Sequence, residues 1–179
     1  DEMQRVLDGC RLVEAMTDGA FRPRTPDGEL DPSGFVKGWA IKRAGNALRN
    51  RGLRDWCLTV GGDVQVAGTR AGKPWRVAIG HPEAAEVAAI VQVSDVAVAT
   101  SGTRSAEHPA PREPHIWDRD GEVATTPGSM TVIGPSVDIA DALATGCWAL
   151  KDEAFAVMDR LPEYHLLQVS SQSVQVSEG

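Results

Sequence analysis

The sequence predicts an α+β fold in which a largely antiparallel sheet packs against helices. The chain has 179 residues, enough to bury one sizeable hydrophobic core. Some segments repeat apolar residues at helical spacing, and others are short apolar runs bounded by turn residues. These runs often follow one another directly, without the strict strand–helix–strand alternation of a parallel sheet, which favours the antiparallel arrangement.

Four segments have the features of helices. The first places apolar residues such as Val6, Cys10 and Val13 at helical spacing and ends before Asp18-Gly19. The third follows a proline, and its first residue, Asp138, is a plausible N-cap. We expect helices over Glu2–Met16, Gly38–Asn50, Asp138–Leu150 and Glu153–Arg160.

Seven short apolar runs are typical of strands. They are rich in β-branched residues, and Gly, Asp or Pro residues separate them. From Ser170 the chain is rich in Ser, Gln and Val, and we expect a loose tail over 170–179. The predicted strands are Trp56–Val60, Val64–Ala67, Trp75–Ile79, Val87–Val93, Val96–Thr100, Met130–Ile133 and His165–Val169.

Charge and composition exclude several classes of function. A formal net charge of −7 argues against a nucleic-acid-binding protein, which would usually carry a basic face. No segment is apolar for long enough to span a bilayer, and no leader peptide is visible at Asp1. Two cellular locations remain possible: the protein is cytoplasmic, or it is exported by means of an amino-terminal segment that is missing here. The three cysteines form no CxxC motif, and we expect Cys57 and Cys147 to be buried thiols.

Asp141 and Thr145 form the most informative pair of side chains. They are four residues apart on a predicted helix and therefore share one face, with Asp138 on the same side. A carboxylate and a hydroxyl are the hard oxygen ligands that Mg²⁺ prefers. The alternative is an N-cap followed by an ordinary solvated helix face, which the spacing alone favours.

Four other motifs allow a ligand, and each also has a plain structural interpretation. Gly34, Lys37 and Gly38 could bring backbone and an ammonium group close to a phosphate, or they could form a turn before a helix. The runs 60–63 and 98–102 leave strands through small residues, which suits a cofactor pocket or a simple turn. The run 115–118 begins with a histidine that could move a proton or be merely solvated.

Taken together and in order, these motifs resemble the FAD:protein FMN transferases, the ApbE-like family. The motifs read DPSGFVKG, GGD, ATSG, HIWDRDG and ADALATG, and the resemblance runs from about residue 17 to about residue 150. Each motif is weak alone, whereas five in the right order are specific. The resemblance implies an ApbE-like fold, with residues 1–169 as one flavin transferase domain that lacks the family's first segment, including an aromatic-rich stretch that helps to cover the adenine.

The resemblance also implies cofactors, partners and roles for individual residues. Family members bind FAD and Mg²⁺ and transfer FMN to a Thr or Ser hydroxyl of a partner protein, often a membrane redox subunit; whether Mg²⁺ or another divalent ion is used here, and whether the chain forms a homodimer, stay open. His115 is implied in proton transfer. The implied metal ligands are Gly34, Asp141, Thr145 and Ala144. The implied FAD contacts are Ala20, Phe21, Asp31, Lys37, Gly62, Asp63, Thr100, Ser101, Gly102 and Ile116.

Two residues depart from the family pattern. Arg22 stands where an aspartate is common, and Arg119 stands where a proline is usual. The alternative to a transferase is a flavin-binding protein, or an inactive fragment of a transferase, that binds FAD without transferring FMN.

Overall fold

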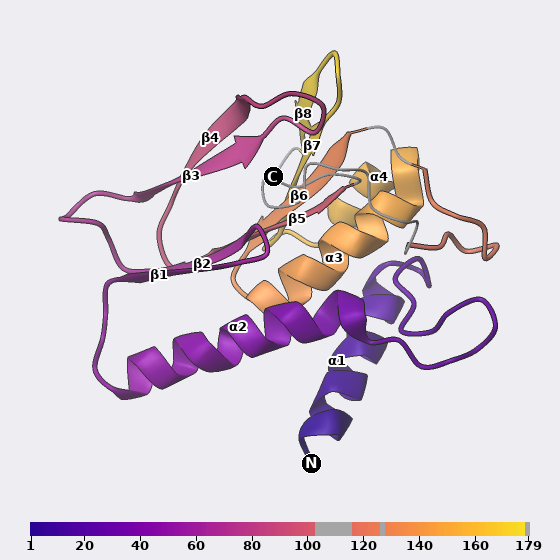
Figure 1. Ribbon diagram of the computed structural model, residues 1–179, viewed down its shortest axis with the longest axis horizontal. Helices are drawn as coiled ribbons and strands as arrows, with labels where there is room; N and C mark the ends of the chain where they lie inside the picture. Colours follow the sequence, from indigo (N-terminus) through magenta and orange to yellow (C-terminus); the bar gives the residue numbers. More distant parts are fainter. Residues whose placement is uncertain (103–115, 126–127, 178–179) are drawn as a thin grey trace.

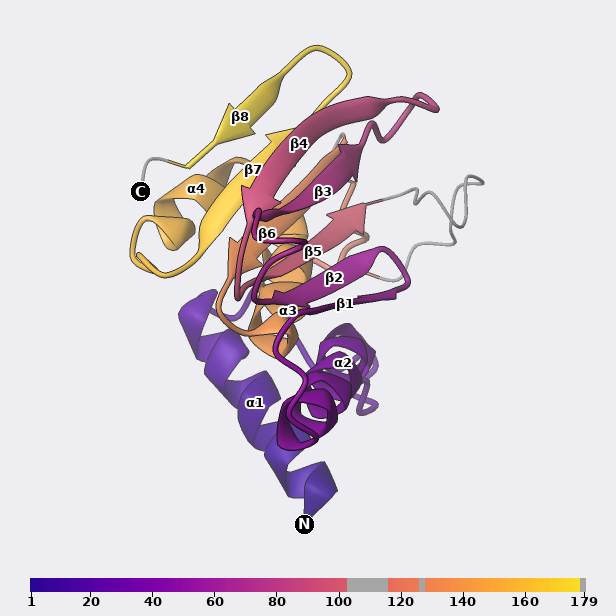
Figure 2. The same cartoon turned by 90° about the vertical axis from the view of Figure 1, so that its left-hand side faces the viewer.

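The computed structural model describes residues 1–102, 116–125 and 128–177. Three layers make up the molecule: helices, a six-stranded antiparallel sheet, and a two-stranded hairpin on the opposite face of that sheet (Figures 1 and 2). The predicted α+β class with an antiparallel sheet is therefore confirmed.

The main sheet has the strand order β1-β2-β5-β6-β7-β8, with every neighbouring pair antiparallel. The hairpin consists of β3 and β4. The strands of the main sheet are β1 (Trp56–Val60), β2 (Asp63–Ala67), β5 (Ala97–Gly102), β6 (Ser129–Gly134), β7 (His165–Val169) and β8 (Val174–Val176). The hairpin strands are β3 (Trp75–Gly80) and β4 (Val87–Val93).

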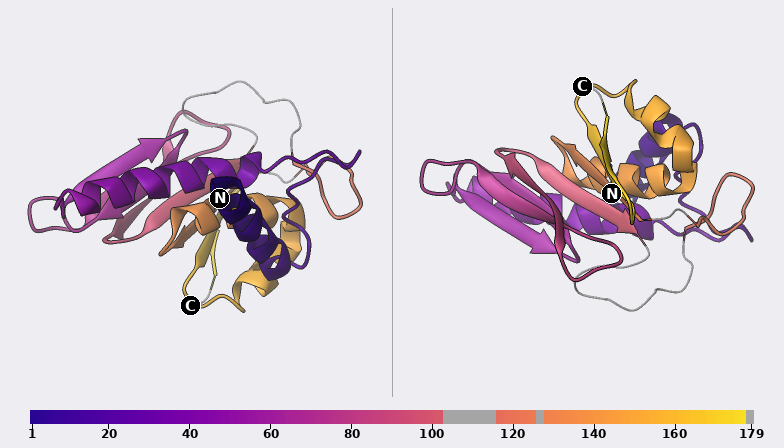
Figure 3. Two further views of the ribbon diagram at one scale, coloured as in Figure 1. Left: turned by 90° about the horizontal axis from the view of Figure 1, so that it is seen from below. Right: turned by 90° about the horizontal axis from the view of Figure 1, so that it is seen from above.

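One helix lies at the centre of the helical layer. This helix, α3 (Val137–Leu150), is buried along almost its whole length because it packs on β5 and β6 on one side and on α2 on the other. Figure 3 shows α1 and α2 on the outer side of the layer. The other helices are α1 (Glu2–Met16), α2 (Ser33–Asn50), a 3₁₀ turn η1 (Lys151–Glu153) and α4 (Ala154–Met158).

Alternation along β5 divides the hydrophobic core into two parts. Ala97 and Ala99 face the helices, whereas Val98 faces the β3–β4 hairpin. This is the period of two that a strand imposes on its side chains. Small residues on the helical side of β5 leave room for α3, which places the side chains of α3 next to the end of that strand.

Besides shifts of one or two residues at element ends, such as α4 over Ala154–Met158 and β5 over Ala97–Gly102, four sequence expectations differ from the structure. Helix α2 begins at Ser33 rather than Gly38, so the DPSGFVKG motif forms the first turns of the helix. Ser136, not Asp138, occupies the N-cap position of α3, and Asp138 lies in the first turn. Cys57 is exposed because β1 is an edge strand, although Cys147 is buried as expected. The tail expected to be loose contains β8, which pairs with β7.

Within the described ranges, none of the helices combines the length and the apolar character that a membrane span requires.

Candidate functional site

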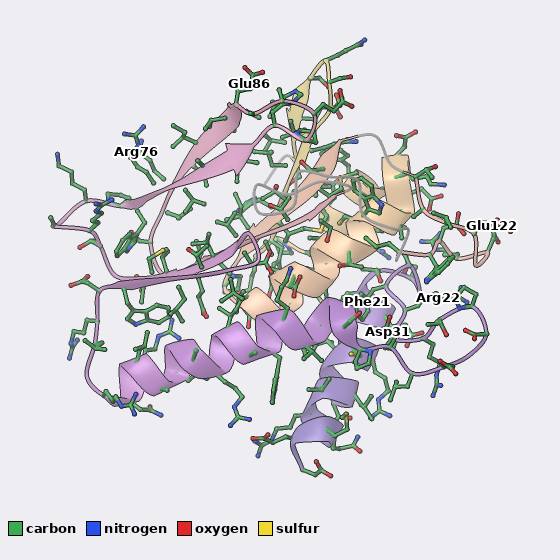
Figure 4. The ribbon with its side chains drawn as sticks, viewed as in Figure 1. Phe21, Arg22, Asp31, Arg76, Glu86 and Glu122 are labelled. Atoms are coloured by element: carbon green, nitrogen blue, oxygen red, sulfur yellow. The ribbon has the colours of Figure 1, made fainter. Side chains whose placement is uncertain are left out.

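A cavity of about 270 Å³ lies where the amino-terminal end of α2 meets the end of β5 and the middle of α3. Figure 4 shows Phe21, Arg22 and Asp31 gathered at this end of α2. The lining residues come from several distant parts of the sequence: Ala20, Phe21, Arg22, Arg24, Asp31, Ser33, Gly34, Lys37, Gly61, Thr100, Ser101, Gly102, Ile116, Trp117, Asp141 and Thr145.

A buried ionic cluster forms the floor of this cavity. The ammonium nitrogen of Lys37 lies 2.9 Å from Oδ2 of Asp63 and 3.2 Å from Oδ1 of Asp141. The two carboxylate side chains are 0% and 4% exposed, whereas the lysine is 35% exposed and faces the cavity. Backbone N–H groups complete the arrangement, because Gly38 donates to Asp141 at 2.9 Å and Thr100 donates to Asp63 at 3.2 Å.

The cluster holds two carboxylates and one ammonium group, and burial together with this charge imbalance shifts the pKa of all three groups. Burial raises the pKa of Asp141, the charge of Asp63 raises it further, and it reaches about 7 although Lys37 and the Gly38 N–H act in the opposite direction. Burial also raises the pKa of Asp63 despite its pairing with Lys37. Burial disfavours the charge of Lys37, but Asp141 and Asp63 outweigh it, so the pKa of Lys37 is raised. Such a cluster favours an additional cation.

Residues of three different elements surround the hydroxyl of Thr145. Its hydroxyl lies 3.2 Å from the hydroxyl of Ser101 at the end of β5. It also donates to the backbone oxygen of Asp141, one helical turn earlier, at 3.3 Å. Gly34 packs against Thr145, since a Cβ atom built on Gly34 would lie 3.5 Å from the threonine hydroxyl oxygen. A side chain on Gly34 would therefore occupy the space in front of Thr145.

These groups fit a hard divalent cation. A carboxylate, a hydroxyl and backbone carbonyls are oxygen donors of the kind that Mg²⁺ takes. The part of the chain that the structure describes contains no group of three or more His, Cys, Asp or Glu side chains arranged to hold a metal. That finding is compatible with the metal ligands expected from the sequence. Asp141 is the only carboxylate among them, and Gly34 and Ala144 would contribute backbone oxygens.

The turn between β1 and β2 serves as a hairpin connection. Gly61 and Gly62 both have positive φ, 57° and 91°, as the tight turns of hairpins require. Gly61 lines the cavity, whereas Gly62 does not. Asp63, which follows them, lies below the cavity surface and contacts two lining residues, Lys37 and Thr100.

Most residues expected from the sequence come together at this cavity. Eleven of them line it: Ala20, Phe21, Gly34, Asp31, Lys37, Thr100, Ser101, Gly102, Ile116, Asp141 and Thr145. Gly62, Asp63 and Ala144 do not line it. His115 falls outside the described residues. Asp138 is also separate, since it pairs with Lys42 at 2.8 Å, one turn further along α2 than Gly38.

Five lining residues were not expected from the sequence: Arg22, Arg24, Ser33, Gly61 and Trp117. Four of them are adjacent to an expected residue, and Arg24 lies three residues after Phe21. Arg22 had a further signal, since it stands where the resembling family commonly has an aspartate.

Comparison with known proteins assigns the family. The sequence model of the ApbE family matches residues 1–167. The chain belongs to the ApbE family. Two solved ApbE structures share its fold. The Thermotoga maritima ApbE protein superposes with a TM-score of 0.84 at 23% identity, covering 99% of this chain and 76% of that one. The apo flavinyl transferase ApbE of Pseudomonas stutzeri gives 0.78 at 20% identity, covering 98% and 71%.

Curated relatives in the ApbE family carry the name FAD:protein FMN transferase. The protein from Vibrio cholerae is 31% identical over 147 residues, which are 76% of this chain and 44% of that protein. The protein from Rhodobacter capsulatus is 33% identical over 142 residues, which are 77% of this chain and 27% of that protein. The chain therefore spans less than half the length of these two relatives.

Proposed function

We propose that this ApbE-family chain binds FAD in the cavity beside α2 and moves its FMN half onto a hydroxyl of a partner protein. The observation that carries the proposal is the buried Lys37–Asp63–Asp141 cluster at the cavity floor. Two carboxylates that share one ammonium group are costly to bury. Buried charged groups with strongly shifted pKa values at a cavity are typical of functional sites, which supports a charged ligand here. The names of the relatives supply the reaction, because they are called FAD:protein FMN transferases.

The cavity matches the chemistry of a dinucleotide. Apolar surface from Ile116 and Trp117 suits a flat aromatic ring, and hydroxyls at the end of β5 suit the polar parts of the ligand. Asp141 and Thr145, with the backbone oxygens of Gly34 and Ala144, would hold Mg²⁺ beside the pyrophosphate. When bound there, the ion would neutralise phosphate charge.

The proposed reaction exchanges one bond to phosphorus for another. The acceptor oxygen of a Thr or Ser forms a bond to the phosphorus of the FMN half, the P–O anhydride bond breaks, and AMP leaves with the bonding electrons. The hydroxyl proton must pass to a base, and the family resemblance assigns that role to His115. Lys37 lies within the cavity wall and would stabilise negative charge that develops on the phosphate oxygens.

Gly38 and Thr100 contribute by orienting the cluster. Their backbone N–H groups fix one oxygen of Asp141 and one of Asp63, which leaves the other oxygen of each carboxylate directed at Lys37. The charged groups are therefore positioned before any ligand arrives, and this preorganisation is the main contribution that a protein makes to phosphoryl transfer. We propose that residues 1–169 work in this way as a single flavin transferase domain.

A direct test combines the chain with FAD, Mg²⁺ and an acceptor protein or peptide that carries a Thr. Mass spectrometry then detects FMN attached to the acceptor. We expect attachment with FAD and none with FMN, because FMN has no anhydride bond to break. An Asp141→Asn variant should show much slower transfer. If FAD binds in the presence of Mg²⁺ but no acceptor is ever modified, the chain is a flavin-binding protein and the transferase proposal is wrong.

A further inference from the structure

One wall of the cavity is a small hairpin formed by residues 116–124. The backbone of Trp117 bridges that of Val123, and the N–H of Ala124 donates to the carbonyl of Ile116 at 2.9 Å. Nearer the tip, the N–H of Asp118 donates to the carbonyl of Glu122 at 2.8 Å. Ile116 and Trp117 belong to the cavity lining. The position of this hairpin, which we call the wall hairpin, therefore sets the shape of one side of the site.

The wall hairpin contacts the rest of the molecule at both ends. At its base, Ala124 is buried in the hydrophobic core and its carbonyl oxygen accepts a hydrogen bond from Trp148 at 3.4 Å. Its tip is held by polar contacts. Nη1 of Arg22 donates to the carbonyl oxygens of Asp118 and Arg119, at 3.2 and 3.0 Å. On the other side, the side chain of Asp118 lies 3.5 Å from Lys151, and that of Arg119 lies 3.0 Å from Glu153. Figure 4 shows Arg22 directed toward the loop that carries Glu122.

Arg22 is well placed to hold another segment because its own backbone follows a fixed residue. Phe21 is 1% exposed, and its N–H donates to the hydroxyl of Thr17 at 3.0 Å. That hydroxyl in turn donates to the carbonyl of Val13 in α1. A carboxylate at position 22 could not make the contacts of Arg22, because an ionised carboxyl group only accepts hydrogen bonds, as carbonyl oxygens do.

We propose that Arg22 is a positioning residue that holds the wall hairpin against the cavity and so sets the place of Ile116 and Trp117. The effect on ligand binding rests on the proposed function, since it assumes that FAD occupies the cavity. The effect on the hairpin itself does not, because the contacts of Arg22 are present without a ligand.

Arg24 provides a matched control. It is also an exposed arginine that lines the cavity, but its Nη1 donates to the carbonyl of Gly28 at 2.9 Å, within its own loop. Arg22→Ala and Arg24→Ala therefore remove the same charge from the same cavity, and only the first removes contacts with the wall hairpin. Arg22→Lys keeps the charge and a donor, and it should restore part of the effect.

The first measurement needs no ligand. The protein is labelled with 5-fluorotryptophan, the ¹⁹F signal of Trp117 is assigned with Trp117→Phe, and amide exchange is followed over residues 116–124. In Arg22→Ala we expect the Trp117 signal to shift and the amides of Asp118 and Ala124 to exchange faster. Arg24→Ala should leave both unchanged. Unaltered signal and exchange in Arg22→Ala would overturn the proposal.

The second measurement is FAD affinity by fluorescence titration. Arg24→Ala reports the effect of removing one positive charge from the cavity lining. We expect the Kd of Arg22→Ala to rise about three- to ten-fold more than that of Arg24→Ala, the range for loss of modest hydrogen bonds, with a smaller additional rise for Arg22→Lys. A loosened hairpin with unchanged FAD affinity would overturn the role of the hairpin in binding. If the unaltered protein does not bind FAD, the proposed function fails, whereas the fluorine and exchange data still decide whether Arg22 holds the hairpin.

Discussion

Replacing Lys37 with methionine tests the ionic cluster most directly. The substitution keeps an unbranched side chain of similar size but leaves Asp63 and Asp141 facing each other without the ammonium group that separates them. Removing one partner of a fully buried ion pair costs about 3–5 kcal/mol. Because the Lys37 side chain is 35% exposed, solvent compensates for part of the loss, and we expect about 2–3 kcal/mol in the free energy of unfolding.

Lys42→Met is the matched control for this substitution. Lys42 lies in the same helix and also pairs with an aspartate of α3, with its nitrogen 2.8 Å from Oδ2 of Asp138. The side chain of Lys42 is 41% exposed, and Asp138 retains a hydrogen bond from the N–H of Ile139. We therefore expect a loss of about 1 kcal/mol or less. Urea unfolding in the presence of EDTA measures the free energy of unfolding of both variants. Equal losses would show that the buried cluster stabilises the protein no more than an ordinary, partly exposed ion pair does.

The pH dependence of stability follows from the raised pKa of Asp141. Its pKa is about 7 in the folded protein, against an ordinary value of 3.8, so the folded state binds the proton more tightly than the unfolded state does. The stability that this group contributes is present below its ordinary pKa and is lost as the pH rises through about 7. Metal-free protein should therefore unfold more easily at about pH 8 than at about pH 5, and Lys37→Met should widen that difference. If Lys37→Met lowers the free energy of unfolding by the same amount at both pH values, this account is wrong.

Three further predictions concern the ligand and the thiols. FAD should bind more tightly with Mg²⁺ than with EDTA, because Asp141 and Thr145 would hold the ion beside the pyrophosphate; equal affinities in a fluorescence titration would exclude them as ligands. His115→Asn should leave FAD affinity nearly unchanged and lower the rate of FMN transfer by about a hundred- to ten-thousand-fold. In native protein, a thiol reagent should label the exposed Cys57 first and reach Cys147, whose burial raises its pKa to about 12, only after unfolding. Rapid labelling of two thiols by native protein would contradict that order.

Local pattern was sufficient to predict most of the sheet. The strands β1, β4 and β7 have the predicted bounds, because a short apolar run between turn residues has few other ways to bury its side chains. The turn at Gly61-Gly62 was recognisable for a similar reason, since both residues need a positive φ that other residues rarely adopt. Strand β8 was missed because its three residues are exposed and gain their structure from pairing with β7.

The arrangement of the site depended on tertiary contacts that the motifs do not encode. Lys37, Asp63 and Asp141 lie far apart in the sequence, and nothing in their spacing shows that one ammonium group serves two carboxylates. The resemblance implies that Asp63 contacts FAD, and in the structure its carboxylate lies beneath Lys37 and outside the cavity lining. Asp138 and Asp141 share a helix, yet the first pairs with Lys42 in the middle of α2 and only the second reaches the cavity.

Gly38 shows how a residue can be recognised by its motif and still act for a different reason. Its place beside Gly34 and Lys37 in the motif suggested a backbone that comes close to a ligand, but the structure places it against another helix. A Cβ atom at this position would lie 2.6 Å from the carbonyl oxygen of Val137 and 2.7 Å from Cα of Asp138, both of them backbone atoms that cannot turn aside. The absence of a side chain therefore sets the distance between α2 and α3, and at that distance the N–H of Gly38 reaches Asp141. The packing of α2 on α3 and the orientation of the Asp141 carboxylate are therefore coupled. Any change that separates the two helices also breaks the hydrogen bond from the N–H of Gly38 to Asp141.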